Sequence, residues 1–332
     1  MATYKGIQGY SVENLSSDPT AAEALGQLWY NSTTKSFKVS TEGAGAWSAG
    51  PSLNLARAEM GYARNATLNT GTVFGGDAPP GTSPPGYTKN TEQYDGSTWT
   101  EVADLNNGRS GFGSLGISTA AMAISGNAQP GPTSNFCETW DGTSWSEGNQ
   151  VLTKRQGLYG AGTTTAGLAA TGTSTADTES YDGTCWSQGK DVNNIRNAGG
   201  SCGLQTTALI FAGTPGPGKY TELWDGTCWT SVNILNAGRT QVDAGFGVPT
   251  SAMCAGGNTP GDARMAECET YDGTSWTEVG DLAVATRMGS GGGTTASGFV
   301  AGGYPANTPP TETATMEIWA DPVYTIKTVT VS

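Results

Sequence analysis

The sequence contains no histidine, and charged residues make up only 14% of the chain. Without imidazole there is no Ser-His-Asp or Cys-His nucleophile activation, no histidine metal ligand and no histidine general base. Most common hydrolytic mechanisms are therefore excluded. We expect a protein without enzymatic activity, cofactor or metal.

Positive charge is also scarce, because 16 Lys and Arg residues face 29 Asp and Glu residues, for a formal net charge of −13. Such a chain repels phosphate backbones and anionic membrane surfaces at long range. No apolar run is long enough to span a bilayer, and the start MATYKGIQGYSVENL lacks the basic and apolar regions of a signal peptide. We expect a soluble protein with no export signal, no nucleic-acid partner and no membrane insertion.

Glycine, in contrast, is abundant, with 50 among 332 residues. This is about twice its usual share, which favours turns and short strands over helices. The composition therefore predicts an all-β protein, and chains of this length can form one β-barrel or propeller domain.

One motif, Glu-x-aromatic-Asp-Gly-x-x-Trp, recurs five times. The copies are EQYDGSTW (92–99), ETWDGTSW (138–145), ESYDGTCW (179–186), ELWDGTCW (222–229) and ETYDGTSW (269–276), followed by a degraded copy EIWADPVY (317–324). An Asp-Gly pair between two strand-like stretches is typical of a tight hairpin, since Gly supplies positive φ and Asp accepts bonds from turn amides.

An arginine follows each motif tryptophan after ten residues, or eleven in the last repeat, and Trp47 starts the series without a full motif. The tryptophans are Trp99, Trp145, Trp186, Trp229 and Trp276, and the arginines are Arg57, Arg109, Arg155, Arg196, Arg239 and Arg287. A short apolar run ending in glycine comes next, as a buried strand closed by a breaker would. Six repeats of four strands follow, which at this period is typical of propeller blades.

The double-glycine strand end, the Glu-x-Tyr-Asp strand, the tryptophan and the arginine together resemble kelch-type repeats over roughly residues 47–325. The resemblance implies a six-bladed kelch-like β-propeller over residues 47–332. It implies little about chemistry, because propellers carry unrelated functions.

The repeated aromatic and arginine side chains allow two interpretations each. The tryptophans could stack on sugars, but their repetition favours wedges between adjacent blades. The arginines could converge on an anion, but we favour pairing with a motif glutamate, or with backbone carbonyls, inside the scaffold.

Repeat length varies almost entirely between the strand-ending glycine and the next motif glutamate. This connection joins the second and third strands, so one face of a propeller is variable and the opposite face, with the Asp-Gly turns, is uniform. The variable segments are 77–91, 127–137, 214–221, 258–268 and 304–316. They contain Tyr87, Tyr220 and Tyr304, which we take as candidate residues for binding a glycan or protein.

The six cysteines follow the repeat and form no CxxC pair. Cys185 and Cys228 occupy one motif position in neighbouring repeats, and Cys137 and Cys268 both precede a motif glutamate. Equivalent positions in different blades are too far apart for a disulfide. We therefore expect free thiols and folding in a reducing compartment.

The two ends of the chain lie outside the repeats. Residues 1–46 predict an extended arm, with some helical character at 19–24, followed by a hairpin at 28–39. We favour an arm that anchors the protein to another subunit through Tyr4, Ile7, Tyr10 and Leu15. The tail from Tyr324 alternates as a strand and is expected to complete the last blade, although whether Trp47 or this tail closes the ring stays open.

The leader GIQGYSVENLSSDPTAAEALGQLWYNSTTKSFKVSTEGAGAWSAG, followed by LNLAR and repeated TxYDGTSW units, resembles kelch-like structural proteins of tailed phages of marine bacteria, including cyanophages. The resemblance spans almost the whole chain. It implies a virion protein assembled in the host cytoplasm and exposed on capsid or tail, which contacts other virion proteins through residues 1–46. The alternatives are a glycan-binding recognition module, a purely stabilising cement protein and a carbohydrate-active enzyme.

Overall fold

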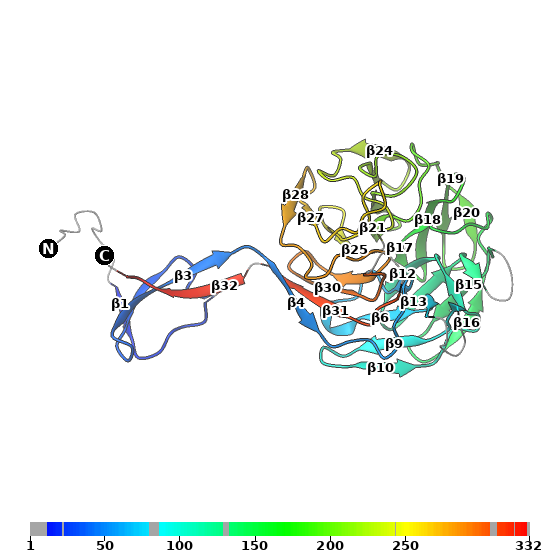
Figure 1. Cartoon of the computed structure of the whole chain (residues 1–332). Coiled ribbons are helices and arrows are strands. Elements are labelled where there is room, and N and C mark those ends of the chain that lie inside the picture. The colour runs from blue at the N-terminus through cyan, green and yellow to red at the C-terminus, as the bar shows by residue number, and fades with distance from the viewer. Residues whose placement is uncertain are drawn as a thin grey trace. The chain divides into compact units, whose positions relative to one another are not determined.

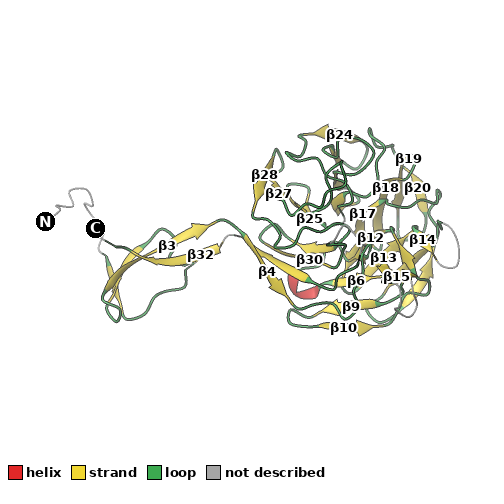
Figure 2. Ribbon diagram, viewed as in Figure 1, coloured by secondary structure: helices red, strands yellow, loops and turns green. Residues whose placement is uncertain are grey.

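The computed structural model describes residues 12–21, 23–79, 86–128, 133–242, 244–305, 311–321 and 323–330. The chain divides into a large unit, Ala46–Ala320, and a small unit that combines Met1–Gly45 with Asp321–Ser332. The described residues contain no α-helix, and one 3-10 turn, Leu68–Thr70, interrupts the strands and loops (Figure 2). The all-β prediction is confirmed, and no described helix is long and apolar enough to cross a membrane.

The described part of the large unit contains six four-stranded sheets, which we number in chain order. Sheet 1 consists of β5 (Gly61–Tyr62), β6 (Thr72–Phe74), β9 (Thr91–Tyr94) and β10 (Trp99–Val102). Sheet 2 consists of β12 (Gly113–Ile117), β13 (Ala120–Ile124), β15 (Cys137–Trp140) and β16 (Trp145–Gly148). Sheet 3 consists of β17 (Tyr159–Thr163), β18 (Ala166–Gly172), β19 (Thr175–Tyr181) and β20 (Trp186–Gln188).

The remaining sheets repeat this antiparallel order. Sheet 4 consists of β21 (Gly200–Leu204), β22 (Thr207–Phe211), β23 (Thr221–Trp224) and β24 (Trp229–Val232). Sheet 5 consists of β25 (Gly245–Val248), β26 (Ser251–Ala255), β27 (Cys268–Tyr271) and β28 (Trp276–Val279). Sheet 6 consists of β29 (Ser290–Gly293), β30 (Ser297–Ala301), β31 (Met316–Ala320) and β4 (Ala46–Gly50). Two short ribbons, β7 (Asp77–Ala78) with β8 (Gly86–Tyr87) and β11 (Arg109–Ser110) with β14 (Asn127–Ala128), complete the unit.

The fourth strand of sheet 6 comes from the start of the large unit. Strand β4 pairs antiparallel with β31, and Trp47 lies opposite Trp319. The prediction that the tail completes the last blade is wrong, because β32 (Val323–Thr328) instead pairs with β3 (Ser36–Gly43). Both segments alternate as strands should, but β4 carries the motif tryptophan that packs against the aromatic residue of the neighbouring strand.

The first strands of the six sheets contact one another in order. Strand β5 contacts β12, and contacts then run from β12 through β17, β21 and β25 to β29, which also contacts β5. Strands β12, β17 and β25 lie toward the middle of the large unit, whereas β10, β24 and β28 lie at its rim (Figure 1). These sheets fit a β-propeller-like fold.

Backbone hydrogen bonds join neighbouring sheets next to the first strands. In each repeat one residue just after the position of the arginine has a left-handed φ between 54° and 64°: Glu59, Gly111, Gly157, Ala198, Gln241 and Met288. Within the described residues, the Glu59 N–H donates to the carbonyl of Met288, the Gly111 N–H to that of Glu59, and the Gly157 N–H to that of Gly111. The Ala198 N–H donates to the carbonyl of Gly157, the Val242 N–H to that of Ala198, and the Met288 N–H to that of Gln241. We call the six left-handed residues, Glu59, Gly111, Gly157, Ala198, Gln241 and Met288, the ring segment.

The glycine that ends each second strand is a steric requirement. Gly126 has φ +89°, and a Cβ added there would lie 2.4 Å from the Cβ of Phe112. Gly303 has φ +97°, and its Cβ would lie 2.6 Å from the carbonyl oxygen of Arg287. These close approaches explain why the apolar runs end in glycine.

The motif aspartates hold the hairpins between third and fourth strands. Asp95 Oδ1 accepts the backbone N–H groups of Ser97 and Thr98, both at 2.8 Å, and Asp141 accepts those of Thr143 and Ser144. These bonds to the charged form lower the pKa of Asp95 and of Asp141 to about 2. The prediction of tight Asp-Gly turns is confirmed at these positions.

The small unit contains a sheet in the order β1 (Glu13–Leu15), β2 (Leu28–Asn31), β3 and β32. The hairpin predicted at 28–39 is present as β2 and β3. Residues 19 and 20 have no regular secondary structure and residues 21, 23 and 24 form turns, so the described residues of 19–24 are not helical. Asp18 fixes the segment before the hairpin, because its Oδ1 accepts bonds from Trp29 Nε1 (2.9 Å) and Asn31 Nδ2 (2.6 Å).

The anchoring residues proposed from the sequence are placed only in part. Leu15 pairs with Asn31 across β1 and β2. Tyr4, Ile7 and Tyr10 lie outside the described residues. The tail joins this unit as well, so the segment outside the repeats is larger than residues 1–46.

The turn aspartates generate a prediction about acid stability. Their pKa values in the folded protein lie below the unfolded value of about 3.9, so their stabilising contribution is present above about pH 4 and is lost as the pH falls toward about 2. The double variant Asp95→Asn, Asp141→Asn is therefore expected to lose less unfolding free energy than the wild type between these pH values, measured by urea denaturation. The control is Asp281→Asn, an exposed aspartate outside the turns, and parallel curves for the wild type and the double variant would contradict the prediction.

Candidate functional site

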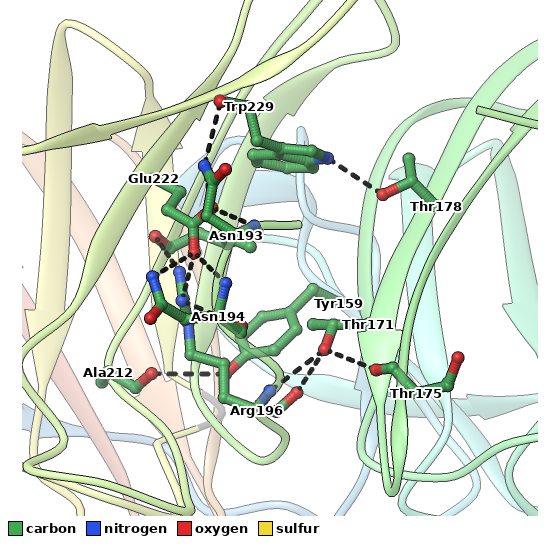
Figure 3. Close-up of polar contacts among 11 residues, drawn as sticks. Tyr159, Thr171, Thr175, Thr178, Asn193, Asn194, Arg196, Ala212, Glu222 and Trp229 are labelled. Carbon is green, nitrogen blue, oxygen red and sulfur yellow. Dashed lines mark hydrogen bonds and ion pairs between the residues drawn. The ribbon is translucent and has the colours of Figure 1, made fainter. Parts of the chain in front are cut away.

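Five of the six repeated arginines form buried ion pairs with motif glutamates, counted over the described ranges. The pairs are Arg57–Glu92 (2.7 Å), Arg109–Glu138 (2.6 Å), Arg155–Glu179 (3.1 Å), Arg196–Glu222 (2.6 Å) and Arg239–Glu269 (2.6 Å). Figure 3 shows the arrangement for sheet 4, where Glu222 Oε2 also accepts the backbone N–H of Asn193 at 2.8 Å. One carboxylate thus holds both the arginine and the connection that enters its sheet.

The motif tryptophans lie between sheets. Trp229 of sheet 4 donates its indole N–H to Thr178 Oγ1 of sheet 3 at 2.9 Å (Figure 3). Trp145 and Trp276 make the same bond to Thr91 and Thr221 of their preceding sheets, at 3.0 and 3.1 Å. The indoles of Trp99 and Trp186 donate to the backbone carbonyls of Pro51 and Asn149. All five tryptophans are buried, so none offers an open ring face to a sugar.

Arg287 departs from the pattern expected of the arginines. Because the last interval is one residue longer, Thr286 occupies the tenth position after Trp276. Glu317 still accepts the backbone N–H groups of Ala283 and Val284, at 2.7 and 3.1 Å, but Arg287 does not reach it. A cavity of about 10 Å³ remains, lined by Thr286 and Glu317. Gly302 and Thr315 also line it, and they occupy the positions whose backbone carbonyls bind the arginine in other sheets.

The side chain of Arg287 instead enters a polar network of sheets 5 and 6. It binds Gln241 Oε1 and lies 3.4 Å from Asp262 Oδ1. Asn258 Nδ2 donates to Gln241 Oε1 at 3.0 Å, and Arg264 Nη1 donates to Asn258 Oδ1 at 3.0 Å. The amide oxygen of Gln241, the ring-segment residue of sheet 5, therefore accepts hydrogen bonds from both Arg287 and Asn258.

A cavity of about 330 Å³ lies beside the other ring-segment residues. Glu59, Gly111, Gly157, Ala198 and Met288 all line it, so it is formed by sheets 1 to 4 and 6. The variable segments contribute Asp77, Tyr87 and Asn127, and the connections of sheets 3 and 4 contribute Gln156 and Asn197. This cavity, on the side of the variable segments, is the candidate functional site.

Arg64 also lines the cavity and is only 4% exposed. Its Nε donates to the carbonyl of Ser114 at 2.9 Å, and its Nη1 donates to the carbonyl of Ser201 at 3.3 Å and to the hydroxyl of Tyr62. No carboxylate of the described residues forms an ion pair with it. The arginine links sheets 1, 2 and 4 through two backbone carbonyls and the Tyr62 hydroxyl.

Two carboxylates stand on the sheet 1 wall of the cavity. Burial, together with the nearby Asp77 carboxylate, raises the pKa of Glu59 above its ordinary value. Asp77 Oδ2 accepts the hydroxyl of Tyr304 at 3.0 Å. Burial and the Asp77 carboxylate also raise the pKa of the Tyr304 hydroxyl, so this group stays a donor.

The three candidate tyrosines are placed differently. Tyr87 lines the cavity and pairs with Asp77 in the β7–β8 ribbon. Tyr304 is buried beside Asp77, and the Arg287 guanidinium lies 5.5 Å from its ring centroid. Tyr220 is 38% exposed and does not line the cavity. The structure thus brings Tyr87 and Tyr304 together beside Asp77, and of the three tyrosines Tyr87 lines the cavity.

Sequence analysis did not select Glu59, Arg64, Gln156 or Asn197. A departure from the repeat could have indicated Glu59, because it is the only charged residue among the six ring-segment residues. Arg64 and Arg264 are the two arginines outside the repeated position, and both lie in or beside this region.

All six cysteines are free, as predicted. Burial raises the pKa of the Cys137 thiol to about 11, and those of Cys202, Cys254 and Cys268 to about 12. In the part of the chain that the structure describes, no three Asp, Glu or Cys side chains gather as a metal site. No protein-family model matches the chain, and a search of curated proteins found no match.

Because Glu317 of sheet 6 has no arginine partner, the effect of the ion pair can be measured by comparing two glutamate variants. Glu138→Gln leaves the buried charge of Arg109 uncompensated, so we expect it to lower the unfolding free energy by about 3 kcal/mol or more. Glu317→Gln removes a carboxylate that has no arginine partner, and about 1 kcal/mol is expected. Urea denaturation of both variants measures the difference, and equal losses would contradict the role given to the ion pair.

Proposed function

We propose that the chain is a non-enzymatic structural protein of a tailed-phage virion, exposed on capsid or tail. In this proposal the six sheets are the blades of a closed, kelch-like β-propeller. The small unit attaches the protein to other virion proteins, and the variable segments are presented for host-surface contacts.

The backbone bonds of the ring segment support closure of the propeller. They join the sheets in chain order and then connect Glu59 of sheet 1 to Met288 of sheet 6. The pairing of β4 with β31 brings the first strand of the large unit into sheet 6. Both observations are what closure of a ring from its two ends requires.

The sheet of the small unit carries the attachment proposal, because one of its faces has a cluster of partly exposed apolar side chains, with Asn14 and Lys327 beside it. Trp29 is buried on one face of β2, whereas Leu28 and Tyr30 alternate onto the other face. Their partners on β3 are Val39 and Phe37, and Phe37 is 44% exposed. An exposed apolar cluster of this kind is typical of a protein-protein contact.

The chain ends strengthen this assignment. Strand β32 completes the small unit by pairing with β3 from Lys38–Thr328 to Gly43–Val323. The six repeats therefore form one insertion between the two halves of the small unit. The small unit is therefore one attachment unit, built from the two segments that flank the repeats.

The chemistry of the scaffold supports a structural role. Five arginines and five motif glutamates of the described ranges are committed to internal pairs, and they leave the remaining exposed surface depleted in positive charge. Free thiols, four of them buried, are compatible with assembly in a host cytoplasm.

Substitution of Phe37 tests the attachment. Phe37→Asp places a charge on the apolar face without removing a buried side chain, so we expect the purified protein to fold and its abundance in phage particles to fall about tenfold or more. Ile234→Asp is the matched control, because Ile234 is 53% exposed in the large unit, and normal incorporation is expected.

Quantitative mass spectrometry of particles purified from the phage that encodes the chain measures both variants. Equal incorporation of Phe37→Asp and wild type would contradict the attachment role, and absence of the wild-type chain from particles would contradict the virion assignment. Turnover of a glycan panel by the purified protein would contradict the non-enzymatic assignment.

A further inference from the structure

We infer that the cavity beside the ring segment binds one neutral sugar residue of a glycan. This inference deepens the proposed host-surface contact and rests on it for its biological role. The volume of about 330 Å³ lies at the lower end of the range typical of small-molecule sites. It suits a terminal sugar and not a long oligosaccharide.

The polar groups of the cavity match vicinal hydroxyls. The side chains of Gln156 and Asn197 line it and make no hydrogen bond to the described residues. Each amide offers two donors and an accepting oxygen, and a sugar hydroxyl both donates and accepts. Tyr87, in the β7–β8 ribbon, also lines the cavity and adds a further side chain with a hydroxyl.

The carboxylates set the charge of the ligand. Glu59 and Asp77 line one wall, and no arginine or lysine of the described residues pairs with either. They can accept charge-assisted bonds from sugar hydroxyls, whereas they repel an acidic sugar. Arg64 does not reverse this preference, because its single positive charge faces the two carboxylates of the lining, and its Nε and Nη1 donate to the carbonyls of Ser114 and Ser201.

Apolar groups provide a surface for the C–H face of a sugar ring. Phe112, Leu158, Met60 and Met288 line the cavity together with the polar groups. Phe112 is held in place by Phe74, with ring centroids 5.8 Å apart. A mostly prebuilt wall lowers the cost of ordering side chains on binding.

Sheet 6 accounts for the position of the site. Arg287, displaced from the buried pair, joins Gln241 and Asp262, and this network fills the part of the ring segment that belongs to sheet 5. The open part is therefore confined to sheets 1 to 4 and Met288. One site per chain is expected, although the scaffold has six repeats.

Saturation-transfer NMR on the full chain tests the inference. The probes are the methyl glycosides of glucose, galactose, mannose and N-acetylglucosamine, with methyl glucuronide as the acidic comparison. We expect binding of at least one neutral glycoside and none of the glucuronide. Gln156→Ala should weaken that binding about tenfold or abolish it, while the exposed Gln27→Ala of the small unit should bind as the wild type does.

Three results would overturn the inference: no binding of any neutral glycoside, binding of the glucuronide alone, or equal affinities for the wild type and Gln156→Ala. Thermal unfolding of both variants controls for folding, since neither glutamine side chain makes a hydrogen bond within the described residues. Failure here is distinguishable from failure of the virion proposal. Gln156→Ala should enter particles normally, and Phe37→Asp should still bind the glycoside.

Discussion

The buried pair of an arginine and a motif glutamate is the interaction on which the large unit depends. In Arg196–Glu222 the carboxylate holds the guanidinium at 2.6 Å and, with its other oxygen, the backbone of the incoming connection. A buried pair of this kind is costly to break, because the charge of the partner that remains is buried without compensation. The pair therefore fixes how each connection enters its sheet, and with it the left-handed residue that bonds to the next sheet.

The sixth repeat shows what happens when this constraint is released. One additional residue before Arg287 moves its charge out of the interior and into the network with Gln241 and Asp262. Glu317 keeps its backbone bonds, so the connection still enters sheet 6 in the usual way. The sixth repeat retains its fold, but its arginine now binds Gln241, the ring-segment residue of sheet 5. The cavity lies beside the other five ring-segment residues.

The local turns of this structure could be predicted from the sequence, and so could the contacts that recur from repeat to repeat, such as the arginine–glutamate pairs. The long-range contacts that occur only once could not. The Asp-Gly turns, the glycine at the end of each second strand and the hairpin at 28–39 each depend on residues near in sequence. The partner of β32 does not, because β4 and the tail both have strand character and only pairing across the chain decides between them. The site follows the same rule, since Glu59, Arg64 and Gln156 meet only after several repeats have folded together.

Amide hydrogen exchange of the native protein tests most directly whether the six sheets form one closed ring around the cavity. If they do, the amides of Glu59, Gly111, Gly157, Ala198, Val242 and Met288 exchange together at the slow rate set by global unfolding. Earlier exchange of Glu59 and Met288 than of the other four amides would show that sheets 1 and 6 separate in the native protein. That result would contradict a closed ring and the site built on it.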